Sequence, residues 1–218
     1  MTYLTLAVCA AFIPLGYYGI LWLQRPAFEQ EKNRNRKILR TAPEYLVMLL
    51  SESALIRLWW ARGQSDFTDT TFLSLVIVLI TMSVLCMTDY WETVVPNRIL
   101  LGMLAAFVIV LGSGAARSLD GVVALLPGIV LGFLFTAIAF GASFLVSRGN
   151  IGAGDVKLSL VLGLMMTGEY VVGAIVYGCI ASAVFSIVML LFKKVNRKDQ
   201  IPFVPFLYLG VIIRCWIG

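Results

Sequence analysis

The sequence predicts an all-α fold, a polytopic integral membrane helix bundle with about eight transmembrane segments. Hydrophobic residues make up 60% of the 218 residues and charged residues only 13%, whereas soluble domains carry about 25% charge. The hydrophobic residues gather in long runs, and an apolar run of about 18 residues can cross a bilayer as a helix. We therefore expect one membrane-embedded domain over 1–218, with no separate soluble domain.

The candidate helices are apolar runs separated by short polar segments. The sixth run is too short to cross at about 1.5 Å per residue, so it is expected to be tilted, re-entrant or half-spanning. A basic cytoplasmic loop is expected at 24–44. The runs cover 3–23, 45–60, 72–87, 99–111, 122–146, 158–166, 171–192 and 203–217.

The positions of the basic residues predict the orientation. Most of the 17 Lys and Arg residues fall in the segments 24–44, 88–98, 147–157 and 193–200. Short cytoplasmic loops of membrane proteins collect Lys and Arg, so these segments are expected inside the cell and the N-terminus outside. The protein is thus predicted to be a multi-pass protein of the plasma membrane, in contact with the lipid bilayer.

Composition also excludes several functions. The net charge of +5 comes from basic residues in short loops and not from a folded basic face, so no nucleic-acid partner is expected. The chain contains no histidine, which removes Ser-His and Cys-His catalysis. The four cysteines lack the paired spacing of metal sites, so neither a metal nor another cofactor is expected. Carboxylates remain as the acid–base groups for any hydrolysis.

Two aspartates are the candidate catalytic residues. Asp89 closes the third apolar run and Asp155 opens the sixth, so the expected topology places both at the cytoplasmic face. An aspartate at a membrane helix end is often functional when it faces the bundle, although a structural helix-end carboxylate is an ordinary alternative. Two carboxylates about one water apart share a proton, so that one acts as acid and the other as base.

The sequence around each aspartate supports a site cut into the end of the bundle. Asp155 follows Gly152 and Gly154, whose backbones can approach a substrate strand closely, and it precedes Lys157. A plain glycine-rich loop with an N-cap aspartate is the structural alternative. Asp89 is followed by a polar break that ends at Pro96 and Asn97. Irregular backbone near a membrane is tolerated inside protein or beside water.

The segments DYWETVVPNRIL, GAGDVKLSLVLG and IPFVPFLYLG resemble, in order and spacing, the three signatures of the type IV prepilin peptidases, the G-x-G-D membrane aspartic proteases. The resemblance implies that Asp89 and Asp155 are the catalytic pair. It also implies that Gly152, Gly154 and Lys157 are motif residues beside the substrate. The implied activity is cleavage of the short basic leader of type IV pilin-like precursors at the cytoplasmic membrane face.

The sequence departs from the longer bacterial members of that family in three places. Loop 24–44 has no cysteine, so the family's zinc module is not expected. The stretch GYYGILWLQRP lacks the usual pattern near the first helix, so the resemblance does not extend to methyltransferase activity. Val204 stands where the family usually has glycine.

Other functions compete with this one. A proton- or cation-coupled transporter would use the same two aspartates, but the sequence shows no matching halves and the acids lie at helix ends. A non-catalytic assembly subunit would not need both aspartates in these contexts. Other G-x-G-D proteases that cut within membranes are closer, and the IPFVPF ending favours the prepilin branch. The sequence does not indicate the oligomeric state or the particular precursor.

Overall fold

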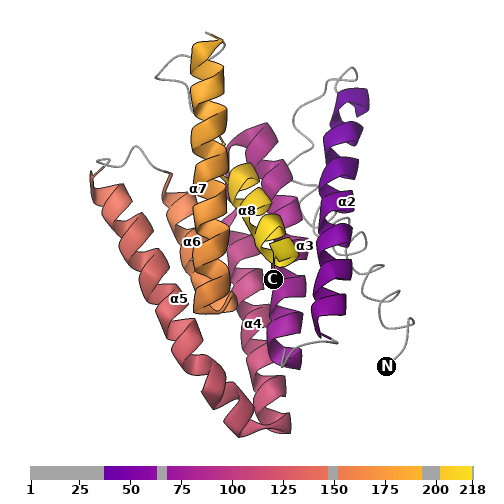
Figure 1. Cartoon of the computed structure of the whole chain (residues 1–218), viewed down its shortest axis with the longest axis vertical. Helices are drawn as coiled ribbons and strands as arrows, with labels where there is room; N and C mark the ends of the chain where they lie inside the picture. The colour runs from indigo at the N-terminus through magenta and orange to yellow at the C-terminus, as the bar shows by residue number, and fades with distance from the viewer. Residues whose placement is uncertain (1–36, 63–67, 147–151, 193–201, 218) are drawn as a thin grey trace.

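The structure is a computed structural model that describes residues 37–62, 68–146, 152–192 and 202–217. Every regular element within these ranges is an α-helix, which confirms the predicted fold class (Figure 1). The helices are α2 (Lys37–Arg62), α3 (Asp69–Glu92), α4 (Asn97–Arg117), α5 (Leu119–Val146), α6 (Ala153–Met165), α7 (Gly168–Leu191) and α8 (Val204–Ile217).

Four of these helices are long and apolar enough to cross a bilayer, namely α3, α4, α5 and α7. A multi-pass membrane bundle therefore fits the described chain. The prediction of about eight spans is not confirmed, because α6 and α8 have only 13 and 14 residues. The helix expected at 3–23 lies outside the described residues.

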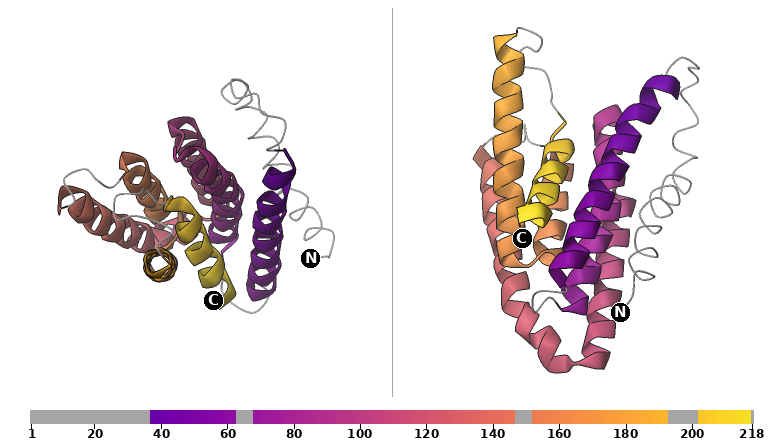
Figure 2. Two further views of the ribbon diagram at one scale, coloured as in Figure 1. Left: turned by 90° about the horizontal axis from the view of Figure 1, so that it is seen from above. Right: turned by 45° about the vertical axis from the view of Figure 1, so that its right-hand side comes forward.

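Helix α3 forms the centre of the bundle. In its apolar window 72% of the residues are buried, against 33% in α4 and 17% in α5 and α7. Helices α2, α4, α6 and α8 all pack against α3 (Figure 2). A residue on α3 therefore faces protein over most of the helix, whereas α5 and α7 leave most of their apolar surface for lipid.

The sixth apolar segment turns back before it reaches the far end of the bundle. Helix α6 ends at Met165 and α7 begins at Gly168, and their junction lies partway along α5 (Figure 1). Glycines allow this close contact, because a methyl group on Gly132 of α5 would lie 2.5 Å from the Gly163 carbonyl oxygen of α6 and 3.0 Å from the Met166 carbonyl oxygen. The short α6 is thus a half-length helix packed on α5, one of the three outcomes that the sequence left open.

Helix boundaries differ from the apolar runs in two informative places. Helix α2 begins at Lys37 and contains Pro43, so the end of the expected loop 24–44 is helical. Lys, Arg and Leu are good helix formers, and they extend a helix beyond its apolar part. Helix α6 begins at Ala153, before the apolar run, and this places Asp155 in its first turn.

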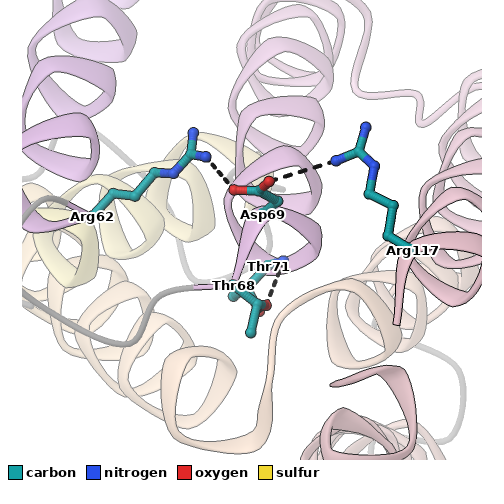
Figure 3. Close-up of polar contacts among 5 residues, drawn as sticks. All are labelled: Arg62, Thr68, Asp69, Thr71 and Arg117. Carbon is teal, nitrogen blue, oxygen red and sulfur yellow. Dashed lines mark hydrogen bonds and ion pairs between the residues drawn. The ribbon is translucent and has the colours of Figure 1, made fainter. Parts of the chain in front are cut away.

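Exposed ion pairs connect α3 to its neighbours at the end of the bundle where α3 begins. Asp69, in the first turn of α3, forms ion pairs with Arg62 of α2 and with Arg117 of α4 (Figure 3). The Thr68 side chain caps α3 by accepting a hydrogen bond from the Thr71 amide at 3.3 Å. These contacts fix the N-terminal end of α3 relative to its neighbours.

Candidate active site

Asp89 lies in the last turn of α3, where its side chain is only 5% exposed. Its Oδ2 atom accepts a hydrogen bond from the backbone amide of Val204 at 3.0 Å. The neighbouring Phe203 amide also favours the charged form of the same carboxyl group. A carboxylate buried at a helix end is thus stabilised by backbone N–H groups from a segment far away in the sequence.

The chain leaves α3 through an uncommon backbone conformation directly after this aspartate. Thr93 adopts left-handed angles, φ 52° and ψ 34°, and its amide donates to the Asp89 carbonyl oxygen at 2.9 Å. A β-branched residue in this region is strained, by about 1–3 kcal/mol. Pro96 is the N-cap of α4, and Asn97 is its first residue. The polar break expected between the third and fourth helices is therefore a short segment that starts with a strained turn.

Asp155 occupies the first turn of α6 and is partly exposed. Gly152 is the N-cap of this helix, so the structural alternative in which Asp155 is the N-cap is wrong. The carboxyl group of Asp155 lies over Gly152, since a methyl group there would be 3.2 Å from Oδ2. Burial, helped by the negative charge of Asp89, raises the pKa of Asp155 to about 6.

The two motif segments are packed against each other. A methyl group on Gly154 would lie 3.0 Å from Cβ of Val95, so glycine allows α6 to contact the α3–α4 connection. Lys157, which is exposed, donates a hydrogen bond from Nζ to Oδ1 of Asn97 at 3.4 Å. The α6 segment with Gly152, Gly154 and Lys157 thus lies beside Pro96, Asn97 and the end of α3.

This arrangement can perform acid–base chemistry. The negative charge of Asp89 disfavours ionisation of Asp155, so below about pH 6 Asp155 can hold a proton while Asp89 remains available as a base. Within the described ranges, no group of three His, Cys, Asp or Glu side chains is placed to hold a metal ion.

Sequence reasoning missed three features of the site. These are the Val204 amide on Asp89, the strained Thr93 and the close packing of Val95 on Gly154. The signature IPFVPF was a signal for the first of them, because it marked the start of α8 as part of the motif set. Nothing in a sequence shows which carboxylate a backbone amide contacts.

Asp89, which is buried, and Asp155, which is partly exposed, come from different helices of a bundle whose long helices could cross a membrane, and together they form a candidate acid–base site. The family model described as "Type IV leader peptidase family" matches residues 76–187, which is more than half of the chain and includes both aspartates. The chain belongs to the type IV leader peptidase family.

One curated relative is the "Prepilin leader peptidase/N-methyltransferase" of Bacillus subtilis (strain 168). It is 28% identical over 155 residues, which cover 70% of this chain and 56% of the relative. The chain thus matches little more than half of that relative's length. No solved structure matches the chain. The family match gives no support to the transporter alternative.

Proposed function

We propose that the protein is an aspartic endopeptidase that removes the short basic leader of type IV pilin-like precursors. The observation that carries this proposal is the pairing of Asp89 and Asp155, which come from different helices and lie close enough that the charge of Asp89 helps to raise the pKa of Asp155. The family match and the relative from Bacillus subtilis supply the substrate class. Water activated by one carboxylate is the nucleophile, so no covalent enzyme intermediate is required.

The proposed reaction needs one protonated and one ionised carboxyl group. The ionised carboxylate takes a proton from water as the hydroxide adds to the scissile carbonyl carbon. The protonated carboxyl group gives its proton to the carbonyl oxygen, which yields a gem-diol. The diol then loses a proton, the amide nitrogen gains one, and the C–N bond breaks to leave a carboxylic acid and an amine.

We place this site at the cytoplasmic face of the plasma membrane. Asp89 and Asp155 fall in two of the four segments 24–44, 88–98, 147–157 and 193–200, which together contain most of the basic residues of the chain, and positive charge is concentrated on the cytoplasmic side. A precursor's basic leader stays on that side after its apolar helix inserts. The boundary between leader and helix would then lie at the level of the two aspartates.

The substrate strand is proposed to lie along the motif residues. Gly152 and Gly154, together with Pro96, Asn97 and Lys157, border the two aspartates. A peptide bond within a regular helix is shielded, so an unwound glycine at the boundary is the easiest point of attack. The acids proposed to receive the basic leader are Glu29, Glu31, Glu44 and Glu92.

Co-expression with candidate precursors tests the function. The precursors carry a short basic leader that ends in glycine before an apolar helix, and cleavage is measured as a size shift with the new N-terminus identified by mass spectrometry. A bulky residue in place of the boundary glycine, or glutamines in place of the leader lysines, should each slow cleavage. Equal cleavage of all precursors, or cleavage at the external end of the substrate helix, would contradict the proposal.

A further inference from the structure

The first turn of α8 contacts Asp89 directly. Val204 is the first residue of α8, and its amide donates to Oδ2 of Asp89 at 3.0 Å. The first amides of a helix have no acceptor within the helix, so this donor is available to the aspartate. The helix dipole adds partial positive charge at the same place. Both effects favour a negatively charged carboxylate over a neutral one.

Helix α8 is anchored well enough to hold this amide in place. The Tyr208 hydroxyl group donates to the Val47 carbonyl oxygen of α2 at 2.7 Å, and it lies 2.7 Å from Oγ of Ser51. The Phe203 ring, just before α8, packs on Phe140 of α5 with ring centroids 5.9 Å apart. These contacts tie α8 and the residue before it to α2 and α5. Tertiary packing therefore fixes the position of the Val204 amide. Because the donor is a backbone group, no side chain has to be ordered to present it.

Asp155 differs from Asp89 because no backbone donor to its carboxyl group is found among the described residues. The influences on its pKa are burial and the charge of Asp89, and both favour the protonated form. Burial also acts against charge on Asp89, but there the backbone donors oppose it. The environments of the two carboxyl groups are thus unequal, and an unequal pair has separate acid and base members.

We propose that the first turn of α8 assigns the roles of the pair, so that Asp89 is the general base and Asp155 the general acid. This rests on the proposed peptidase function. The Val204 amide occupies Oδ2 of Asp89, which leaves Oδ1 to take the proton from the attacking water. Asp155 gives its proton to the carbonyl oxygen of the scissile bond. Val204 acts through Asp89 and is a positioning residue, and this gives the IPFVPF signature a physical role.

The first experiment is Val204→Pro in the full-length enzyme. Proline is well tolerated at the first position of a helix, so this change removes the donor and keeps α8. A hydrogen bond to a charged group corresponds to about a tenfold to hundredfold effect, so kcat should fall by that factor with little change in KM. The acidic limb of the rate profile should move to higher pH, because the ionised base has lost a donor.

Matched variants separate the amide from the side chain. Val204→Ala and Val204→Gly keep the N–H and lose side-chain packing, so their acidic limb should stay where it is in the wild type. Leu119→Pro is the control for proline itself, because Leu119 is the exposed first residue of α5 and follows an extended Ser118. If Val204→Pro does not fold, an ester in place of the Phe203–Val204 amide removes the same N–H without a ring.

A second measurement does not depend on cleavage. Infrared titration follows the carboxylate band of Asp89, identified as the band that Asp89→Asn removes. In Val204→Pro or the ester variant this band should disappear at a higher pH than in the wild type. If the band shifts but the wild-type protein cleaves no precursor, the result supports the Val204–Asp89 interaction and contradicts the proposed peptidase function. An unshifted band, or an unshifted acidic limb in an active variant, would overturn the assignment of roles.

Discussion

Helix α3 carries one aspartate near each end, and the two are held in different ways. Asp69 is 52% exposed and pairs with the guanidinium groups of Arg62 and Arg117. Asp89 is 5% exposed and accepts a hydrogen bond from the backbone amide of Val204. An exposed ion pair contributes little and ties helices together, whereas a buried carboxylate needs fixed donors. An aspartate at one end of α3 therefore has a structural role, whereas the aspartate at the other end has the chemical role proposed above.

The largest expected effect separates these two roles. Asp89→Asn and Asp155→Asn should each reduce precursor cleavage by about 10²–10⁴-fold, because asparagine keeps the size of the side chain but cannot act as an acid or base. Asp69→Asn is the matched control and should cleave within about twofold of the wild type, as expected for an exposed ion pair. The measurement is the rate of leader removal in membranes with equal amounts of inserted protein. Substantial activity in either active-site variant would contradict the pairing.

The next effect is the pH dependence of cleavage. Asp155 has a pKa raised to about 6 by burial and by the charge of Asp89. If Asp155 supplies a proton, activity should fall as the pH rises through about 6, by up to about tenfold per pH unit. The limb belongs to the coupled pair, and it is measured from kcat/KM between pH 4 and 9. Activity that keeps rising above pH 7 would show that Asp155 is not the acid.

The same pKa has a consequence for the stability of the protein. Asp155 binds its proton more tightly in the folded state than in the unfolded state, where its pKa is 3.8. Its stabilising contribution is therefore complete below about pH 4 and is lost as the pH rises through about 6. The change in melting temperature that Asp155→Asn causes, measured against the wild type at the same pH, should therefore be more positive at pH 8 than at pH 4. An equal difference at both pH values would contradict this linkage.

A smaller effect is expected where α6 meets the α3–α4 connection. Gly154→Ala places a methyl group 3.0 Å from Cβ of Val95, so the two segments must move apart and cleavage should fall several-fold. Val95→Gly in the same protein removes the atoms that the methyl group meets and should restore part of the activity. Gly102→Ala is the control, because a methyl group there meets nothing within 4 Å. No coupling between positions 95 and 154 would argue against this contact.

The smallest structural effect is expected at the exposed end of α3. Asp69→Asn removes both ion pairs, and each exposed pair contributes less than about 1 kcal/mol. The free energy of unfolding should therefore change only slightly, and the change should shrink further in high salt. Denaturation of the detergent-solubilised protein at two salt concentrations measures this. A salt-independent loss of several kcal/mol would mean that Asp69 contributes more to stability than exposed ion pairs do.

No effect at all is expected from metal chelators, because the proposed chemistry uses carboxyl groups and water. Serine and thiol reagents should likewise leave cleavage unchanged, since no covalent nucleophile takes part. Both are measured with the same precursor assay. A reversible loss on chelation that added zinc restores would require a different mechanism.

The fold class and the placement of the two aspartates at helix ends could be predicted from the sequence for clear reasons. Long apolar runs are typical of membrane helices, and Asp89 and Asp155 interrupt that pattern. Their catalytic role stays a prediction. Helix ends were less predictable, because hydropathy marks the lipid-facing part and not the full helix. Helix α2 accordingly begins at Lys37 instead of residue 45.

The contacts of the site could not be predicted because they depend on tertiary packing. The Val204 amide is a backbone group, and its partner is decided by how α8 packs on the bundle. Thr93 is in the left-handed region although glycine or asparagine favours that conformation. The length of α6 depends on the glycine contacts with α5, which no periodicity shows.

Helices α6 and α8 both pack on α3, and their short lengths affect the membrane beside the site. With 13 and 14 residues they rise about 20 Å, against about 30 Å for the hydrocarbon core. A precursor helix of full length lying along them would exceed their apolar height by about 10 Å, or about seven residues. Hydrophobic mismatch of this kind is relieved by tilting, by a thinner bilayer or by an exposed helix end. Under the proposed function, acyl-chain length in the surrounding lipid is therefore expected to affect how readily the leader boundary reaches the two aspartates.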